Sequence, residues 1–141
     1  MENQKPVPGV GVMIFKDGKV LLGKRGGSYA VGEYTFPGGK IEYGESMEDT
    51  VRRETLEECG VVITNIRFQA VVNSIKYAPH HFISTVFLAD WESGEPRTLE
   101  PEKLGDWQWY SLDDLPEPIF EFSKLAIESY KTGKHFFDIE K

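Results

Sequence analysis

The sequence has a single cysteine among its 141 residues, so no internal disulfide can form. It also lacks a signal-peptide pattern and any apolar run near the roughly 18 residues of a membrane-spanning helix. We therefore expect a cytoplasmic protein without a membrane partner. No basic cluster exceeds two residues, and the formal net charge is −7. Nucleic acid is not expected as a main partner, because its binding needs a positive face.

The net negative charge has a second consequence. An anionic substrate would need a local positive charge at its binding site, supplied either by a metal ion or by a few basic side chains. A length of 141 residues suits one substantial core and no second one. We find no internal repeat, linker or low-complexity tract. The sequence therefore predicts a single domain over residues 1–141.

One stretch, residues 39–61, combines a loop with an acidic helix, and it reads GKIEYGESMEDTVRRETLEECGV. It follows a turn-forming run, Phe36-Pro37-Gly38-Gly39, that a helix does not cross easily. Ser46 is predicted to cap the helix, with Asp49 completing a capping box. Gly60 is predicted to end it in the left-handed conformation that glycine adopts most easily.

The acidic residues of this helix lie beside its apolar stripe. The stripe at helical spacing consists of Met47, Val51, Thr55 and Cys59. Glu54 and Glu58 fall beside or inside it, and they are neighbours because they are four residues apart. Buried carboxylates are costly unless paired, and like charges repel. A divalent cation such as Mg²⁺ would remove both problems. In the alternative, Glu57 and Glu58 are solvated and pair with Arg52 and Arg53.

The whole pattern resembles the Nudix box, the signature of the MutT-related diphosphate hydrolases. In this sequence it reads Gly39-x5-Glu45-x7-Arg53-Glu54-Thr55-x-Glu57-Glu58-x-Gly60-Val61. Only Thr55 departs from the family's preference, which is for an aliphatic residue. The resemblance implies the Nudix fold, an α+β architecture built as an α/β/α sandwich. In this fold a mixed sheet is flanked by the box helix and a C-terminal helix. It also implies a nucleotide substrate and Mg²⁺, or Mn²⁺, as cofactor.

Further blocks are similar to the branch of thiopurine-nucleotide and 8-oxo-dGTP diphosphatases. They are residues 8–12, 20–25, 71–74, 100–103, 107–109 and 114–116. This branch implies hydrolysis of a nucleoside triphosphate to monophosphate and pyrophosphate, with the sanitising of modified nucleotides as a role, and a homodimer. Two alternatives stay open. One is hydrolysis of another diphosphate, such as a dinucleoside polyphosphate or nucleotide sugar, which the position of Tyr77 weakly favours. The other is a catalytically silent domain that binds a nucleotide.

The family's roles carry over to matching positions. The resemblance places metal on the Gly39 carbonyl and on Glu54, Glu57 and Glu58. It assigns catalytic roles to four residues: Glu45 as a supporting carboxylate, Arg53 as the residue that orients Glu45 or Glu57, Glu57 as an acid at the metal, and Glu102 as a loop acid that serves as metal ligand or base. Which carboxylate takes the proton from water varies within the family. The alternative for Glu102 is a solvated loop acid, and for Arg53 a surface pair with Glu57.

Substrate contacts are predicted from residue chemistry and family geometry together. The Arg25 guanidinium could clamp phosphate, since it matches phosphate oxygens bidentately; the alternative is an exposed strand end. Lys40, Gly38, Thr35, Phe36 and the segment 119–120 complete the predicted substrate site. We interpret His80 and His81 as one packed and one exposed residue rather than a ligand pair. Trp107 and Trp109 are interpreted as core residues.

The remaining elements follow from apolar periodicity and breaker residues. Strands are expected at residues 10–15, 20–25, 61–73 (as one strand or two), 82–89 and 107–110. Residues 26–34 are expected to form a connecting loop or a flap beside the site. A second helix is expected at residues 119–131, stopping at Gly133.

Overall fold

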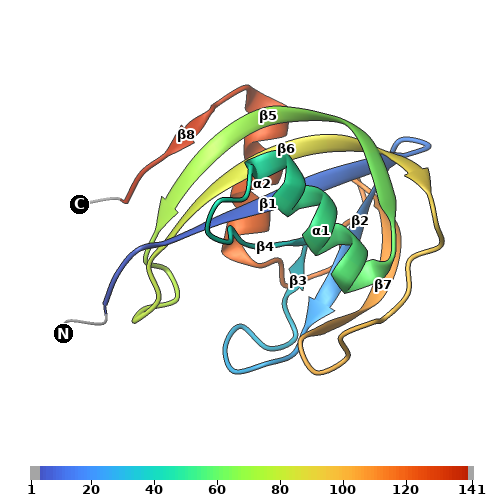
Figure 1. Cartoon of the computed structure of the whole chain (residues 1–141). Coiled ribbons are helices and arrows are strands. Elements are labelled where there is room, and N and C mark those ends of the chain that lie inside the picture. Colours follow the sequence, from blue (N-terminus) through green and yellow to red (C-terminus); the bar gives the residue numbers. More distant parts are fainter. Residues whose placement is uncertain (1–3, 140–141) are drawn as a thin grey trace.

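The computed structural model describes residues 4–139, and a mixed sheet lies at its centre (Figure 1). The strand order is β3-β2-β1-β6-β5-β8, and β4 and β7 pair with β1 and β2 outside this path. The strands are β1 (Val7–Lys16), β2 (Lys19–Arg25), β3 (Tyr34–Thr35), β4 (Gly38–Lys40), β5 (Val62–Ser74), β6 (Phe82–Ser93), β7 (Leu104–Ser111) and β8 (Phe136–Phe137). The β1–β6 and β5–β8 pairs are parallel, and the other pairs are antiparallel.

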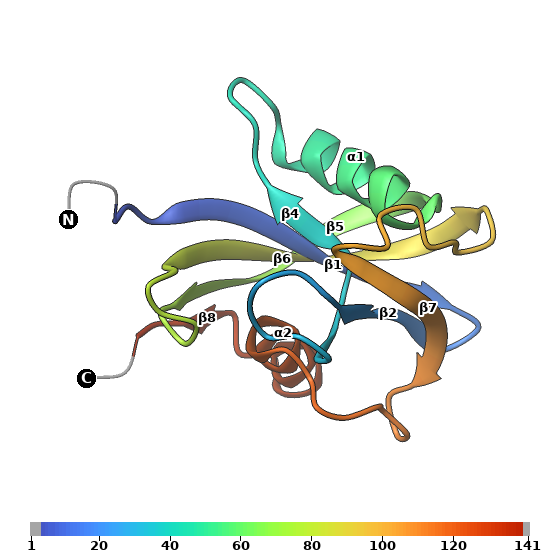
Figure 2. The same ribbon diagram turned by 90° about the horizontal axis from the view of Figure 1, so that it is seen from below.

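Two helices cover opposite faces of the sheet, as Figure 2 shows with α1 above and α2 below. Helix α1 spans Met47–Cys59, and α2 spans Glu121–Thr132. The core under α1 includes Val12, Ile14, Leu21, Val51, Val61 and Trp107. The core under α2 includes Met13, Leu22, Val72, Val86, Ala126 and Phe137. Alternate strand residues point to opposite faces, so one sheet supplies both cores. The predicted α/β/α sandwich is confirmed.

The two ends of α1 match the sequence prediction. The Ser46 hydroxyl accepts a hydrogen bond from Asp49 N at 3.1 Å, and Gly60 ends the helix at φ 75° and ψ 20°. The apolar stripe differs in its first turn, where Met47 is 44% exposed. Thr50, which is fully buried, faces the sheet there instead. Within residues 4–139, neither helix is long and apolar enough to cross a membrane.

Strands β1 and β2 form a hairpin and then separate. Phe15 and Lys16 pair with Val20 and Lys19, but further along β1 pairs with β4 while β2 pairs with β3 and β7. The chain crosses between them from β3 to β4, and Val12 N donates to Pro37 O at 2.9 Å. This separation opens the cleft that is described below.

Several predicted bounds shift once tertiary pairing is formed. Residues 61–73 form one strand, β5, whose register shifts show β-bulges. The first residues of the 39–61 stretch belong to β4 rather than to a loop. Helix α2 starts at Glu121 instead of Ile119, because Ile119 bridges to Tyr34 and Phe120 N donates to Tyr34 O. Its end at Gly133 is confirmed, with φ 82°.

Candidate functional site

A cleft of about 560 Å³ lies where β1 and β2 have separated. Its lining combines acidic, glycine and aromatic residues from distant parts of the chain. They include Gly38, Gly39, Lys40, Glu54, Glu58, Arg25, Tyr29, Tyr77, His80, Phe82, Lys103 and Phe120. The β4 turn and helix α1 thus meet the loop after β2 in one cavity.

Glu58 is the most buried acid of this cleft, with 6% of its surface exposed. Its Oε1 accepts a hydrogen bond from Gly38 N at 3.0 Å. Burial raises the pKa of Glu58 well above the usual carboxyl value, and the negative charges of Glu54 and Glu100 raise it further. A carboxylate in this position favours a nearby cation.

Glu54 lies one helical turn away, and its side chain is 14% exposed. Burial raises its pKa, while the hydrogen bond from Arg53 opposes that shift. The carboxylate packs directly against the backbone of Gly39, where a β-carbon would collide with it. Only glycine leaves room there, so the turn and the acid are matched to each other.

Arg53 ties the loop after β4 to α1. Its Nε and Nη2 donate to the two carboxylate oxygens of Glu45 at 2.7 and 2.9 Å. Its Nη1 donates to Glu54 at 2.5 Å and to Glu57 at 2.8 Å, and Nη2 also donates to Lys40 O at 3.1 Å. The Arg53 hydrogen bond lowers the pKa of Glu45 to about 2. This bidentate pairing fixes the orientation of Glu45 as well as its charge.

The acids of α1 fit a hard divalent cation only in part as they stand. Among residues 4–139, no three acidic, histidine or cysteine side chains converge on one point. Arg53 holds Glu54 and Glu57 instead. Glu54 and Glu58 nonetheless supply what such an ion needs, since both are largely buried carboxylates beside the Gly39 backbone. Glu57 would join them after turning away from Arg53.

The predicted substrate residues line the cleft, with different exposure, except Ile119, which lines a separate hollow. Thr35 and Phe36 are buried. They are tied to α2 by Ser123, whose hydroxyl lies 3.0 Å from both Thr35 Oγ1 and Phe36 N. Lys40 is exposed at the rim, and Arg25 is half-buried among aromatic rings. Thr35 and Phe36 therefore help to shape the floor, whereas Lys40 and Arg25 have charged groups available for a ligand.

The turn before β7 carries two acids, Glu100 and Glu102, and neither of them lines the cleft. Glu102 is exposed and does not line the cleft. The carboxylate of Glu100 instead acts on Glu58, and Lys103 lines the cleft and acts on both Glu54 and Glu58. Lys103 N and Leu104 N donate to Glu100 O, which sets this turn. Sequence spacing indicated the turn but did not show which of its side chains point inward.

The histidine pair precedes β6 rather than lying on a strand. The His80 ring is 4.4 Å from the ring of Tyr29, between centroids, and His81 Nε2 is 2.6 Å from Asn73 Oδ1. His80 is exposed and His81 is partly buried, so the predicted arrangement of one packed and one exposed residue is met in part. Trp107 is buried and Trp109 is partly buried, and both pack in the core under α1, which confirms their interpretation.

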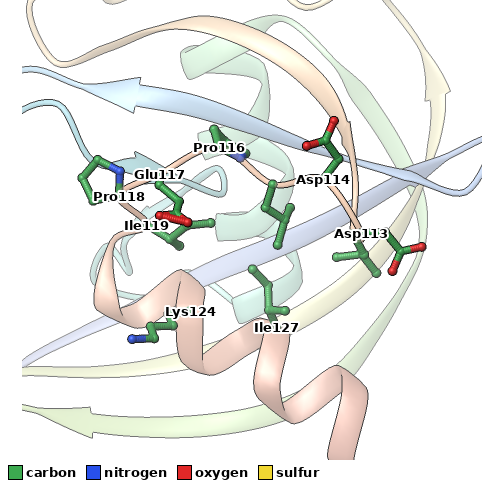
Figure 3. A pocket seen from close by; sticks show the side chains of 10 residues that line it. Asp113, Asp114, Pro116, Glu117, Pro118, Ile119, Lys124 and Ile127 are labelled. Atoms are coloured by element: carbon green, nitrogen blue, oxygen red, sulfur yellow. The ribbon is translucent and has the colours of Figure 1, made fainter.

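A second hollow, of about 630 Å³, lies between residues 112–119 and α2 (Figure 3). Ile127 points into it, whereas the carboxylates of Asp113 and Asp114 point away. It contains none of the acids of α1 and no part of the glycine turn. The cleft between β1 and β2 is therefore the candidate active site.

A helix that presents buried glutamates to a glycine-rich turn, in this fold, defines the Nudix class of hydrolases. The NUDIX domain family matches residues 5–130, and the chain belongs to that family. Members of the family act on nucleotide substrates and generally use divalent metal ions.

The proteins similar to this chain are named for different activities. The NAD-capped RNA hydrolase NudC of Enterobacter sp. (strain 638) is 35% identical over 109 residues, which are 77% of this chain and 40% of the relative. The chain thus spans about two fifths of that relative's length. A MutT NUDIX hydrolase structure from Burkholderia pseudomallei has 37% identity and a TM-score of 0.84, covering 89% of this chain and 98% of the other.

A further solved structure is a complex with a ligand. The NUDIX domain of Shewanella oneidensis NrtR, complexed with ADP ribose, has 25% identity and a TM-score of 0.78. The alignment covers 92% of this chain and 89% of that domain. These relatives confirm the MutT-related family. None of the three is named for the thiopurine-nucleotide branch, which stays a prediction.

Proposed function

We propose that this Nudix hydrolase converts a nucleoside triphosphate to a monophosphate and pyrophosphate in the presence of Mg²⁺, or of Mn²⁺ in its place. The main support is the buried pair of Glu54 and Glu58 beside the Gly39 backbone, in a cleft that also contains aromatic rings. A polyphosphate brings negative charge, and a divalent cation would let it lie beside these acids.

Glu54, Glu57, Glu58 and the Gly39 carbonyl would hold the metal. When bound, the ion would neutralise phosphoryl oxygens and lower the pKa of a bound water. The chain's own task is then positioning and charge balance, as is general for phosphoryl transfer. Arg53 holds Glu45 in a fixed orientation through two hydrogen bonds, whereas Glu57 would have to leave Arg53 to reach the ion.

A carboxylate must accept the proton of the attacking water. The family resemblance leaves open which glutamate does so and offers Glu102 as one candidate, and Glu100, whose charge acts on Glu58, lies in the same turn. Lys103 lines the same cleft and offers a cation to a phosphate oxygen. Lys40, Gly38, Thr35 and Phe36 would contact other parts of the substrate.

A second candidate is cleavage of a diphosphate that joins two larger groups, such as a dinucleotide. It is favoured by the name of the NudC relative, which includes NAD, and by the ADP ribose in the NrtR structure. A silent nucleotide-binding domain is a third candidate. The homodimer and the absence of a nucleic-acid partner stay predictions, and size-exclusion chromatography with light scattering would test the first.

Incubation with Mg²⁺ and a panel of nucleotides, followed by separation of products, distinguishes these functions. Pyrophosphate from a triphosphate supports the first, and two monophosphates from a dinucleotide support the second. Binding of nucleotides without turnover of any would support the third and refute both hydrolytic proposals. Glu58→Gln should abolish turnover, whereas Glu48→Gln, an exposed acid at the start of the same helix, should keep it.

A further inference from the structure

Tyr29 lies at the centre of a group of aromatic rings inside the cleft. Its ring centroid is 4.4 Å from that of His80, 5.7 Å from Tyr77, 6.2 Å from Phe82 and 6.4 Å from Phe120. These five residues, here called the aromatic cluster, line the same cavity as Glu54 and Glu58. A flat ligand group would find several stacking faces there.

One face of the aromatic cluster is rigid. The rings of Tyr77 and Phe120 stack at 4.6 Å with an interplanar angle of 7°. The Tyr77 hydroxyl donates to Glu33 Oε1 and accepts from Glu121 N, both at 2.8 Å. This hydroxyl joins the loop after β2 to the start of α2, so the Tyr77–Phe120 pair forms a fixed wall.

The opposite face is carried by a loop that can adjust. Tyr29 lies between Gly27 and Gly32, which have φ values of 78° and 86°, and the neighbouring Val31 is 65% exposed. Hydrogen bonds from Arg25 N to Glu33 O and from Gly32 N to Arg25 O close the neck of this loop. Tyr29 carries this loop's ring in the group, at 5.7 Å from the Tyr77 ring, so a planar group could stack on Tyr77 there only if the Tyr29 ring moved outward.

Arg25 adds charge and hydrogen-bond donors to the aromatic cluster. Its Cζ is 4.5 Å from the ring centroids of both Tyr29 and Phe120. Its Nε is buried and has no hydrogen-bond partner among residues 4–139, and Nη2 donates one long bond of 3.4 Å to Tyr29 O. Buried donors without acceptors are unfavourable. A ligand in the cleft could supply the missing acceptors.

We infer that the aromatic cluster is the base subsite and that Arg25 makes it selective for an uncharged purine with adjacent acceptors, as guanine has at O6 and N7. A guanidinium fork matches those acceptors bidentately. Aromatic rings alone would attract a positively charged base. The positive charge of Arg25 repels such a base and so disfavours its binding. The inference deepens the proposed function, and Arg25 contacts the base here rather than a phosphate.

Binding of three nucleoside monophosphates tests the inference without requiring turnover. They are GMP, 7-deaza-GMP, which lacks the N7 acceptor, and 7-methyl-GMP, measured by calorimetry at a pH that keeps the methylated ring cationic. The wild-type protein should bind GMP about tenfold more tightly than 7-deaza-GMP. It should bind 7-methyl-GMP more weakly still, because that ring lacks the acceptor and carries a positive charge.

Variants of Arg25 distinguish the effect of its bidentate hydrogen bonding from the effect of its positive charge. Arg25→Met should bind GMP and 7-deaza-GMP equally and should gain affinity for 7-methyl-GMP. Arg25→Lys keeps the charge without the fork, so it should still reject 7-methyl-GMP while losing the preference for N7. Lys24→Met removes an exposed neighbouring cation and should leave the wild-type ranking unchanged. Melting temperatures of all variants would show that each is folded.

Equal affinity of the wild-type protein for the three ligands, or failure to bind any of them, would overturn the inference. So would an Arg25→Met variant that binds all three more weakly by one common factor, since that is the behaviour of a phosphate clamp. Loss of base selectivity in a protein that still releases pyrophosphate would leave the proposed hydrolysis intact. The two proposals therefore fail in different experiments.

Discussion

Replacement of Glu58 by glutamine is expected to stabilise the metal-free protein while it abolishes turnover. The carboxylate is 6% exposed and receives one hydrogen bond from Gly38 N, which a glutamine oxygen can also accept. The substitution keeps the size and removes the buried charge. Leaving a buried polar group unsatisfied costs about 1–3 kcal/mol, and more for a charge. We therefore expect a gain of about 1–2 kcal/mol in the free energy of unfolding.

The pH dependence of this gain follows from the direction of the pKa shift. Burial raises the pKa of Glu58, so the folded protein binds a proton that the unfolded chain has already lost. Stability therefore falls as pH rises from the usual carboxyl value through the raised folded value. The variant lacks this loss. Its advantage should be absent in acid and complete above the folded pKa of Glu58.

Thermal unfolding in EDTA at several pH values, with and without Mg²⁺, measures these effects. At about 3 °C per kcal/mol for a domain of this size, the variant should melt roughly 3–6 °C higher in EDTA at alkaline pH. Added Mg²⁺ should stabilise the wild-type protein, because the ion binds the folded state, and it should have little effect on the variant. The Glu48→Gln control should melt at the same temperature as the wild-type protein in EDTA and should keep the wild-type stabilisation by Mg²⁺. A variant that melts lower than the wild-type protein in EDTA at alkaline pH would refute the reasoning.

Three further predictions concern neighbouring residues. Gly39→Ala places a β-carbon against the Glu54 carboxylate, which would have to move aside, so metal binding should weaken in calorimetry. Arg53→Lys cannot keep the bidentate pairing, so the pKa of Glu45 should rise from about 2 towards its usual value in a carbon-13 NMR titration, and kcat should fall. An unchanged Glu45 titration would contradict this. Burial raises the pKa of Cys59 to about 12, so a thiol reagent should label it at neutral pH only after denaturation, and rapid labelling of native protein would count against the placement.

The local features of α1 could be predicted from the sequence because they depend on residues close together in the chain. Ser46 and Gly60 act within one helical turn, and the box spacing places Glu54 and Glu58 side by side. The exposure of Met47 could not be read from the stripe, since it depends on where the sheet ends beneath the helix. Fine placement thus requires knowledge of the packing partner.

The sequence did not predict features that depend on contacts between residues far apart in the chain. Strands β3, β4 and β8 have two or three residues each, too few for a periodic pattern, and exist because a longer strand lies beside them. The aromatic cluster joins Tyr29 to His80 and Phe120 from separate segments. The charge of Glu100 acts on Glu58, whereas Glu102 is exposed, and neither acid lines the cleft. No single stretch of sequence carries these relationships.

Arg53 forms ion pairs with four glutamates, Glu42, Glu45, Glu54 and Glu57, and this affects how a metal ion can bind. An incoming ion has to compete with an internal cation for Glu54 and Glu57, so part of its attraction is offset by the contacts that it breaks. Such an arrangement favours exchangeable ions over permanently held ones. The catalytic rate should therefore depend on the free concentration of the metal ion. A chelator should readily abolish activity, and added metal ion should restore it.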